Sequence, residues 1–469
     1  MFRRQISAFV LLLFLVGSVV AQVSEVNDYI KAEMARQRIP GVSLAVVKNG
    51  KVIHAEGYGL ANVELNVAVK PETVFKIGSV SKQFIATGIM LLVQQGKLGL
   101  DDKVSKYLEG TPETWSAISL RHLLTHTSGL VREAPGFEPF KVQNDADVIK
   151  TAYSLPLRFQ PGEKWEYCNL GYFMLAEIIR KATGKPWEDY LKDQVFSPLG
   201  MTATRTTTVV EIIPNRASAY ALRNEKLQNT DNWPAVRPSG AFLSTVLDLA
   251  KWEAALNTDK VLNKSDREQM WTPVTLNSGR KYPYGFGWDL DDLRGVSTVN
   301  HGGTLTGFRA LFTRFPEHGL TIIVLTNLAN ANVDAISRGV AGLFIPEIRL
   351  NALQPQTTPD PAMTTMFQGM LAEYAKGVKE LKQATPELVT YLSDASQRNR
   401  DELSALLKNT KSFEFLARRD IQGKGFLKLG IPVTSLWLYR LTTNENKTFH
   451  YSFYLTADKR VADLNVSTN

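Results

Sequence analysis

Cysteine is almost absent from this chain of 469 residues, in which Cys168 is the single example. One cysteine cannot form a disulfide within the chain, so the stability of the fold must come from packing. The sequence also lacks any block of lysine and arginine with interleaved aromatic residues, although its formal net charge is +8. Because this positive charge is spread along the chain, we expect no nucleic-acid partner.

Long apolar runs are missing except at the start of the chain. Arg3 and Arg4 precede an apolar run over 6–20, and the run ends at Ala21 with small residues where a signal peptidase reads. This pattern predicts a secretory signal peptide over 1–21, cleaved after Ala21. The mature protein would then be periplasmic or secreted, without stable membrane insertion. A retained membrane anchor is the alternative, because an apolar segment of ~20 residues can span a bilayer.

The composition is that of an ordinary soluble globular protein, with 44% hydrophobic and 21% charged residues. A chain of this length is expected to form more than one domain. The stretch 349–361 contains three prolines and few apolar residues, which is typical of a linker. We therefore predict a first domain over 22–348, a linker over 349–362 and a small C-terminal α+β domain over 363–469. In the last domain, helices are expected over 364–383 and 396–407, and strands over 412–418, 434–442 and 448–455.

The first domain begins and ends with segments that resemble strands. Two are predicted over 42–47 and 51–57, joined by Asn49-Gly50, a dipeptide that favours the positive φ angles of a tight hairpin turn. Further strands are predicted over 296–300, 308–314 and 320–326. Helices are predicted over 79–95, 171–181, 186–195 and 246–256. We expect an α+β fold in which both ends of the domain close one antiparallel sheet, with the helices packed on it.

The first candidate for chemistry is the pair Ser79 and Lys82, three residues apart at the start of the first predicted helix. The positive end of the helix dipole would favour an incipient alkoxide on Ser79. Lys82 would lie on the same helical face, and a lysine held neutral by burial could take the serine proton. A capped helix with a surface lysine explains the same pair. Ser278 and Lys281 repeat the spacing in a loop, so the spacing alone is a weak signal.

The second candidate is Tyr167 with Asn169, in the only Tyr-x-Asn triplet of the chain. A phenol near a cationic lysine could move protons, and the Asn169 amide could bind a substrate carbonyl and hold the lysine in place. The alternative interpretation is a buried tyrosine whose hydroxyl is satisfied, followed by an asparagine that caps the next helix.

The third candidate is the only His-x-Gly triplet, His301 to Gly303, which is followed by Thr304. It lies on or beside a predicted strand. Adjacent glycines would let a substrate approach the edge of the backbone closely. A β-turn with an incidental histidine is the competing interpretation.

Taken in chain order, these three elements resemble those of the serine β-lactamase and penicillin-binding-protein superfamily. The connecting segments resemble the same proteins, namely 120–130, 159–162, 239–240, 244–245 and 248–249. The resemblance covers about 24–345 and is closest to the branch with the class C β-lactamases, D-aminopeptidases and related esterases. It implies a β-lactamase-like antiparallel sheet flanked by helices, with a helical subdomain, over 22–348.

The resemblance also implies roles in an acyl-enzyme reaction. Ser79 would be the nucleophile, Lys82 and Tyr167 would share the work of general base, and Tyr167 would protonate the leaving group. Asn169 would orient both the substrate and Lys82. The backbone N–H groups of Ser79 and Thr304 would form an oxyanion hole worth ~3 kcal/mol per donor. Such chemistry needs no metal and no organic cofactor.

The chain departs from the family pattern at His301, which with Gly303 belongs to the substrate-binding element. Dedicated β-lactamases of this kind carry a lysine there that helps to hold the substrate carboxylate, and this chain contains no Lys-Thr-Gly or Lys-Ser-Gly. A histidine is largely neutral at pH 7. The departure favours a small-molecule or peptide substrate that is an ester, or an amide of a D-amino acid or peptide, over a penicillin. A true β-lactamase or D,D-carboxypeptidase remains an alternative, as does a catalytically silent binding protein on the same fold.

Two features of the chain suggest other chemistry. His122 and His126 have the i, i+4 spacing of metal ligands, but no acidic residue accompanies them, so we predict no metal site. Cys168 is the middle residue of the Tyr-x-Asn triplet, where any small side chain suffices, so we do not expect a thiol nucleophile.

Overall fold

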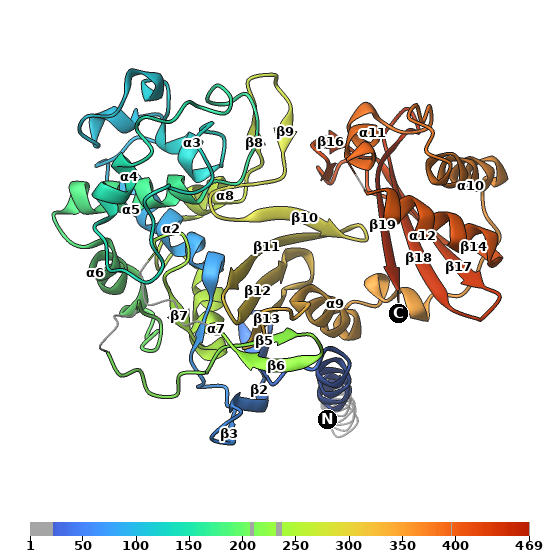
Figure 1. The fold of residues 1–469 in the computed structure, drawn as a ribbon, viewed down its shortest axis with the longest axis horizontal. Helices are drawn as coiled ribbons and strands as arrows, with labels where there is room; N and C mark the ends of the chain where they lie inside the picture. Colours follow the sequence, from blue (N-terminus) through green and yellow to red (C-terminus); the bar gives the residue numbers. More distant parts are fainter. Residues whose placement is uncertain (1–21, 207–210, 231–236, 395, 469) are drawn as a thin grey trace, which may run out of the picture. The chain divides into compact units, whose positions relative to one another are not determined.

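The computed structural model describes residues 22–206, 211–230, 237–394 and 396–468 (Figure 1). The signal peptide predicted over 1–21 lies outside the described residues. None of the described helices is both long and apolar enough to cross a membrane. The chain divides into two compact units, each described separately below. The first contains residues up to Ser278 with Tyr284–Leu290 and Thr298–Ile345, and the second contains Gly279–Pro283, Asp291–Ser297 and Pro346–Asn469.

A seven-stranded sheet forms the centre of the first unit, in the order β10-β11-β12-β13-β1-β2-β3. At its middle, β1 (Gly41–Lys48) lies antiparallel between β2 (Lys51–Asn62) and β13 (Leu320–Thr326). This pairing confirms the prediction that both ends of the domain close one antiparallel sheet. Asn49 and Gly50 join β1 to β2 with φ angles of 49° and 74°, as the tight hairpin turn requires. The other strands are β3 (Val67–Ala68), β10 (Asp289–Leu293), β11 (Val296–Leu305) and β12 (Phe308–Phe315).

Helices cover both faces of this sheet. On one face α7 (Val246–Leu256) packs against β1 and β13, and alternate residues of these strands, such as Ala45, belong to the same hydrophobic core. On the other face α9 (Val333–Phe344) lies against a helix over 22–37, where the Tyr29 hydroxyl donates to the carbonyl oxygen of Ala335 at 2.9 Å. Because both faces are covered, β1 and β13 are buried along nearly their whole length.

The central helix of the first unit is α2 (Lys82–Gln94), which packs on α5 (Asn169–Thr183). Its residues from 82 to 92 are all buried. Phe84 meets the rings of Phe196 and Phe242 edge-on, at centroid distances of 5.1 and 5.7 Å. Truncating a ring buried in this way costs about 3–5 kcal/mol, so these contacts hold α2 firmly in place.

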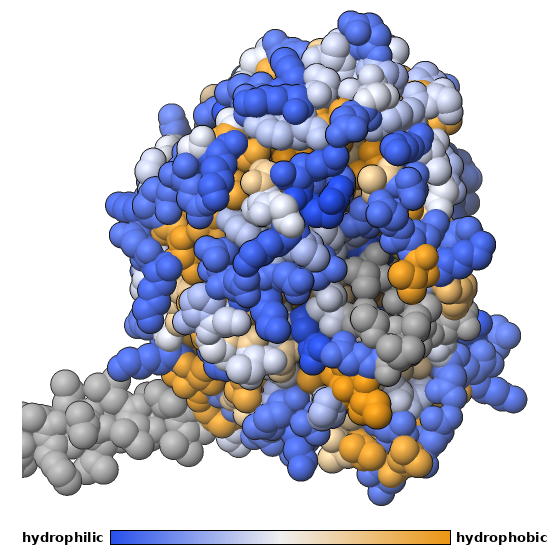
Figure 2. All heavy atoms as spheres, turned by 90° about the vertical axis from the view of Figure 1, so that its left-hand side faces the viewer, coloured by the Kyte–Doolittle hydropathy of each residue, from blue (hydrophilic) through white to orange (hydrophobic). Residues whose placement is uncertain are grey.

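Shorter elements complete the first unit. Its remaining helices are α3 (Leu120–Leu124), α4 (Asp145–Lys150), α6 (Trp187–Leu191) and α8 (Lys264–Met270). Short strand pairs in this unit are β4 (Phe75–Lys76) with β7 (Leu243–Ser244) and β5 (Tyr220–Arg223) with β6 (Lys226–Asn229). The short strand β8 (Val274–Thr275) also belongs to it, whereas β9 (Lys281–Tyr282) belongs to the second unit. The face that carries α4 and α6 is mainly hydrophilic, and its hydrophobic residues are scattered (Figure 2). Scattered surface apolar residues are normal for a soluble protein, so this face supplies no argument for a partner.

The second unit contains a four-stranded antiparallel sheet in the order β14-β17-β18-β19. Its strands are β14 (Thr410–Asp420), β17 (Ser435–Thr443), β18 (Thr448–Leu455) and β19 (Val461–Thr468), with a small pair β15 (Leu427–Lys428) and β16 (Ile431–Pro432). Its helices are α10 (Pro361–Ala375), α11 (Pro386–Ser393) and α12 (Gln397–Lys408). The architecture is α+β, as predicted, although α11 and β19 were not expected.

The second unit has two hydrophobic clusters. One joins residues of α10, such as Phe367, to alternate residues of the sheet, such as Phe453, and these two rings stack at 4.0 Å. The other contains Leu350, which is 3% exposed. Leu350 lies inside the stretch predicted to be a linker, so part of that proline-containing stretch packs in the unit.

Candidate active site

Ser79 lies in a short turn rather than in the α-helix expected over 79–95. Residues Gly78–Ser81 form a 3-10 turn, and α2 begins at Lys82. The turn is pressed against β11, because a Cβ atom added at Gly78 would lie 2.7 Å from the backbone nitrogen of Thr304. Gly78 also has a φ of 52°, a conformation that glycine adopts at least cost. The close packing therefore places Ser79 beside the edge of the sheet.

A cleft of about 400 Å³ opens at Ser79. Four of the predicted site residues line it, namely Ser79, Tyr167, Asn169 and Thr304. The cleft is also lined by charged residues that the sequence did not single out, namely Arg132, Glu133, Arg237 and Arg309. The structure thus gathers residues from distant parts of the chain around one serine.

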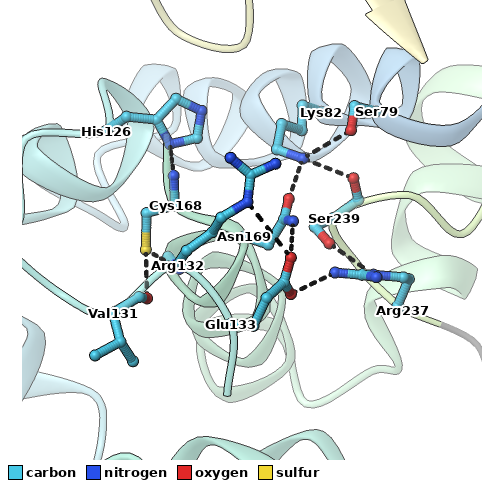
Figure 3. A network of polar contacts seen from close by, with 11 residues as sticks. Ser79, Lys82, His126, Val131, Arg132, Glu133, Cys168, Asn169, Arg237 and Ser239 are labelled. Carbon is cyan, nitrogen blue, oxygen red and sulfur yellow. Dashed lines mark hydrogen bonds and ion pairs between the residues drawn. The ribbon is translucent and has the colours of Figure 1, made fainter. Parts of the chain in front are cut away.

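Lys82 is fully buried behind Ser79 and contacts three acceptors (Figure 3). Its Nζ atom lies 2.8 Å from Asn169 Oδ1, 2.8 Å from the carbonyl oxygen of Ser239 and 3.3 Å from Ser79 Oγ. None of these partners carries a charge. Burial lowers the pKa of Lys82 well below its ordinary value, and the nearby Arg237 guanidinium lowers this pKa further. The lysine therefore has the environment of a neutral amine.

Tyr167 stands beside this lysine, whose Nζ atom lies 4.7 Å from the centre of the phenol ring. Burial raises the pKa of Tyr167 far above its ordinary value, and hydrogen bonding to Ser79 opposes this rise only in part. The phenol is therefore protonated at neutral pH and can donate a proton. Arg132 covers the ring at 5.2 Å.

Asn169 is the first residue of α5, and its amide reaches into the site. The helix starts there because Cys168 acts as N-cap and its Sγ atom accepts from the backbone N–H of Gly171 at 3.4 Å. The Asn169 Nδ2 atom donates to Glu133 at 2.5 Å, which leaves Oδ1 facing Lys82 (Figure 3). The amide is thus fixed from both sides.

His301 is buried behind the site and does not line the cleft; it is 3% exposed. A chain of hydrogen bonds fixes its proton. The backbone N–H of Cys168 donates to His126 Nδ1, so the proton of His126 is on Nε2. His126 Nε2 donates to the Tyr284 hydroxyl at 3.1 Å. The Tyr284 hydroxyl in turn donates to His301 Nε2, also at 3.1 Å. His301 Nδ1 then donates to the carbonyl oxygen of Gly302 at 2.7 Å. Burial lowers the pKa of His301 to about 3, so this histidine is neutral.

Gly303 and Thr304 bring β11 against the serine turn. A Cβ atom added at Gly303 would lie 1.9 Å from the carbonyl oxygen of Ile77, so no other residue fits there without movement. Thr304 is exposed in the cleft. The backbone nitrogen of Thr304 therefore lies against the turn that carries Ser79.

The two histidines with metal-like spacing have other roles in the described structure. His122 forms a capping box with Ser119 at the start of α3. His126 is fully buried within the hydrogen-bonded chain described above. Cys168 is also buried, and burial raises the pKa of its thiol to about 11, so the sulfur is not a thiolate at neutral pH.

Glu133, Arg237 and Tyr284 were missed by sequence reasoning. Glu133 follows the segment 120–130 that resembles the family, and Arg237 precedes the Ser239-Gly240 pair that also resembles it. Their positions beside known segments were a weak signal. Tyr284 had no signal, since only the fold places it between His126 and His301.

Comparison with known proteins identifies the family of the chain. Residues 26–345 match the family model described as Beta-lactamase, and the chain therefore belongs to the β-lactamase family of serine hydrolases. Penicillin-binding protein 4* of Bacillus subtilis (strain 168) is 31% identical over 314 residues, which cover 62% of this chain and 69% of that protein.

Two solved structures share the fold. The octameric penicillin-binding protein homologue from Pyrococcus abyssi superposes with a TM-score of 0.64 at 23% identity, over 95% of this chain and 98% of that one. The D-amino acid amidase from Ochrobactrum anthropi SV3 superposes with a TM-score of 0.60 at 23% identity, over 69% of this chain and 99% of that one. At this level of identity the superpositions establish the fold, which confirms the predicted β-lactamase-like architecture.

Proposed function

We propose that this protein is an exported serine hydrolase in which Ser79 attacks an ester or amide carbonyl and forms an acyl-enzyme. The observation that carries the proposal is the contact of 3.3 Å between Ser79 Oγ and the buried Nζ atom of Lys82. A serine needs a base within such reach to become a nucleophile. The penicillin-binding proteins to which the chain is similar support an extracytoplasmic site of action.

The contacts of Lys82 suit a neutral amine that accepts the serine proton. A neutral amine has two N–H donors and one lone pair. The two shorter contacts, to Asn169 Oδ1 and the Ser239 carbonyl, are to oxygens that only accept. The two N–H groups are directed to them, so the lone pair faces the Ser79 hydroxyl, which can donate. Lys82 thereby acts as general base.

Tyr167 suits the role of general acid. Its phenol stays protonated, because burial raises its pKa, and its ring lies next to both Ser79 and Lys82. We assign to it the protonation of the leaving group as the acyl bond to Ser79 forms, and the proton that Lys82 took from Ser79 then returns to the phenolate. The backbone N–H groups of Ser79 and Thr304 stabilise the oxyanion, and water then hydrolyses the acyl-enzyme.

The substrate class follows from the charge of the site. His301 is neutral and buried, so it does not supply the positive charge that a lysine would supply for a substrate carboxylate. This supports an ester, or an amide of a D-amino acid or peptide. The fold shared with a D-amino acid amidase is consistent with that choice.

One observation favours a second candidate, a β-lactamase or D,D-carboxypeptidase. Arg309 lies in the cleft directly across from Thr304 in the β11–β12 register. Among the described residues it has no ion pair, and its guanidinium donates to the carbonyl oxygen of Phe308 at 3.3 Å. A guanidinium there could hold the carboxylate of a penicillin or a D-peptide in place of His301.

Intact-protein mass spectrometry separates these candidates. The mature protein is incubated with a p-nitrophenyl ester, a D-alanyl anilide and a penicillin. We expect a transient adduct from the ester or anilide that Ser79→Ala abolishes and that the matched control Ser278→Ala, in the other Ser-x-x-Lys sequence, retains. An intact mass that corresponds to a chain cleaved after Ala21 would support export.

Two other results would change the assignment. A penicillin adduct alone, lost in an Arg309→Gln protein that stays folded, would make the second candidate correct. The absence of any adduct would contradict the hydrolase and leave a silent binding protein.

A further inference from the structure

Glu133 bridges two sides of the cleft from the loop that follows α3. Its Oε1 atom accepts from Asn169 Nδ2 at 2.5 Å, and its Oε2 atom accepts from an Arg237 nitrogen at 2.6 Å. The loop itself is fixed, because the backbone N–H of Asn169 donates to the carbonyl oxygen of Arg132 at 2.8 Å. Glu133 is therefore held at a defined place, although its side chain is 44% exposed.

These contacts form a closed ring of hydrogen bonds and ion pairs that includes Lys82 (Figure 3). Lys82 contacts Asn169, Asn169 contacts Glu133, and Glu133 contacts Arg237. Arg237 Nε donates to Ser239 Oγ at 3.2 Å, and the Ser239 carbonyl oxygen accepts from Lys82. Each of the two residues whose oxygens accept from Lys82 thus has its side chain bonded to one member of the Glu133–Arg237 ion pair.

The orientation of the Asn169 amide depends on Glu133, which lies on the side of the amide opposite Lys82. A side-chain amide fits its pocket in two orientations, with the nitrogen and oxygen exchanged. A carboxylate only accepts hydrogen bonds, so Glu133 selects the orientation in which Nδ2 faces it. In the other orientation Nδ2 would face Lys82, whose neutral amine could meet this donor only with its lone pair. The lone pair would then point to Asn169 and no longer to the Ser79 hydroxyl.

We propose that Glu133 is a positioning residue for the acylation of Ser79: it holds the Asn169 amide with its carbonyl oxygen toward Lys82, so that the lysine lone pair faces the serine. The assignment rests on the proposed hydrolase function and extends it to a residue outside the three sequence elements. Glu133 does not contact the reacting atoms and acts through Asn169.

The charge of Glu133 changes the pKa of Lys82, and a residue that gave only structural support would not do so. The negative charge of Glu133 raises the pKa of Lys82, whereas the positive charge of Arg237 lowers it, both acting beside the larger effect of burial. Among the described residues, the other ionisable groups around Lys82 are Arg132, His126, Tyr167, Cys168, Tyr172 and His301. His126 and His301 are neutral, and the phenols and the thiol are protonated, because burial shifts the pKa of each in that direction.

The test is the pH dependence of the acylation rate in the full-length protein, followed with the p-nitrophenyl ester. Glu133→Ala removes both the acceptor and the charge, so we expect acylation about tenfold slower or more, as is typical when a reacting group is misplaced. Glu133→Gln keeps an acceptor for Asn169 but removes the charge, so it should recover much of the rate. Both variants should move the acid limb of the profile to lower pH, by about half a unit or more.

Two further variants complete the experiment. Arg237→Gln should move the acid limb in the opposite direction, to higher pH. Glu138→Ala, on the same loop and paired with Lys141 at 2.6 Å, should change neither rate nor profile. Thermal unfolding of each variant shows whether the fold is kept.

The outcomes distinguish this inference from the proposed function. Wild-type rate and an unmoved acid limb in both Glu133 variants would overturn the positioning role and leave the hydrolase intact. Equal slowing in Glu133→Ala and Glu133→Gln with no movement of the limb would reduce Glu133 to structural support and also overturn it. A wild-type protein that is never acylated would overturn both proposals.

Discussion

The two units of this protein each bury a lysine, and the two lysines are held in opposite states. Lys82 is fully buried in the first unit and contacts only uncharged oxygens, and its pKa falls well below the ordinary value. Lys428 is 6% exposed in the second unit and lies 2.7 and 2.8 Å from the carboxylates of Asp291 and Asp292. Burial lowers the pKa of Lys428, but Tyr454, Asp291 and Asp292 outweigh burial and raise it well above the ordinary value.

Burial alone therefore does not decide whether a lysine in this protein is charged or neutral. Taking an ammonium out of water is costly, so a buried lysine either loses its proton or finds a carboxylate. Lys82 has no carboxylate in contact among the described residues and suits a base. Lys428 has two carboxylates and suits a fixed structural charge.

The largest expected effect is on the first lysine. Lys82→Met keeps much of the buried volume but removes the base, so acylation of Ser79 should fall about 10²- to 10⁴-fold, the range that general acid–base groups contribute. Rapid-mixing measurements with a p-nitrophenyl ester would show the loss. Unchanged acylation in a folded Lys82→Met protein would mean that another group takes the proton.

Replacing Lys428 should lower stability, in contrast to the loss of acylation expected for Lys82. Lys428→Met leaves the carboxylate of Asp292, whose side chain is 1% exposed, without its cation. Breaking a buried pair by removing one partner costs about 3–5 kcal/mol, so the free energy of unfolding of the second unit should fall by that amount. Chemical denaturation followed by tryptophan fluorescence would measure it. If stability were unchanged, the pair would not be buried in solution, and the comparison would fail.

Acid should weaken the first unit through its neutral histidines. The pKa of His301 is lowered to about 3 in the folded state and is ~6.5 in an unfolded chain. The unfolded state therefore binds more protons between these values, and the free energy of unfolding falls as the pH drops from ~6.5 toward 3. The slope is up to about 1.4 kcal/mol per pH unit for one histidine. Denaturation of His301→Gln across this range should show a shallower slope than the wild type, and an identical slope would contradict a neutral His301.

The smallest expected effect is at Cys168. Burial raises the pKa of the thiol to about 11, so it is protonated and serves only as a small capping residue. Cys168→Ser should therefore keep acylation within a few-fold of the wild type and change stability by about 1 kcal/mol. Loss of the acyl adduct in a folded Cys168→Ser protein would point to the sulfur instead of the serine.

The sequence was sufficient to predict the fold of the first unit, because strong local signals agree there. The Asn49-Gly50 turn and the apolar runs that became β1 and β13 fix the sheet and its closure. The second unit was harder. The edge strand β19 carries several polar residues and was not predicted, and burial of Leu350 by tertiary contacts could not be read from the proline-containing stretch around it.

For the site, the sequence identified residues but not their environments. Ser79, Tyr167, Asn169 and Thr304 line one cleft, as their motifs suggested. His301 was expected to meet the substrate, yet Tyr284 holds it behind the cleft, and this position depends on contacts between residues far apart in the chain. The link from Glu133 to Asn169 likewise joins residues from separate segments. Such contacts leave no periodic signal.

The most direct test of Ser79 as nucleophile and Lys82 as its base is fluorophosphonate labelling followed by peptide mapping, in the wild type and in Lys82→Met. We predict one label on Ser79 in the wild type and a rate of labelling lowered at least 10²-fold without Lys82. A label on the neighbouring Ser81 or on Cys168, or an equal rate of labelling of Ser79 in both proteins, would contradict this prediction.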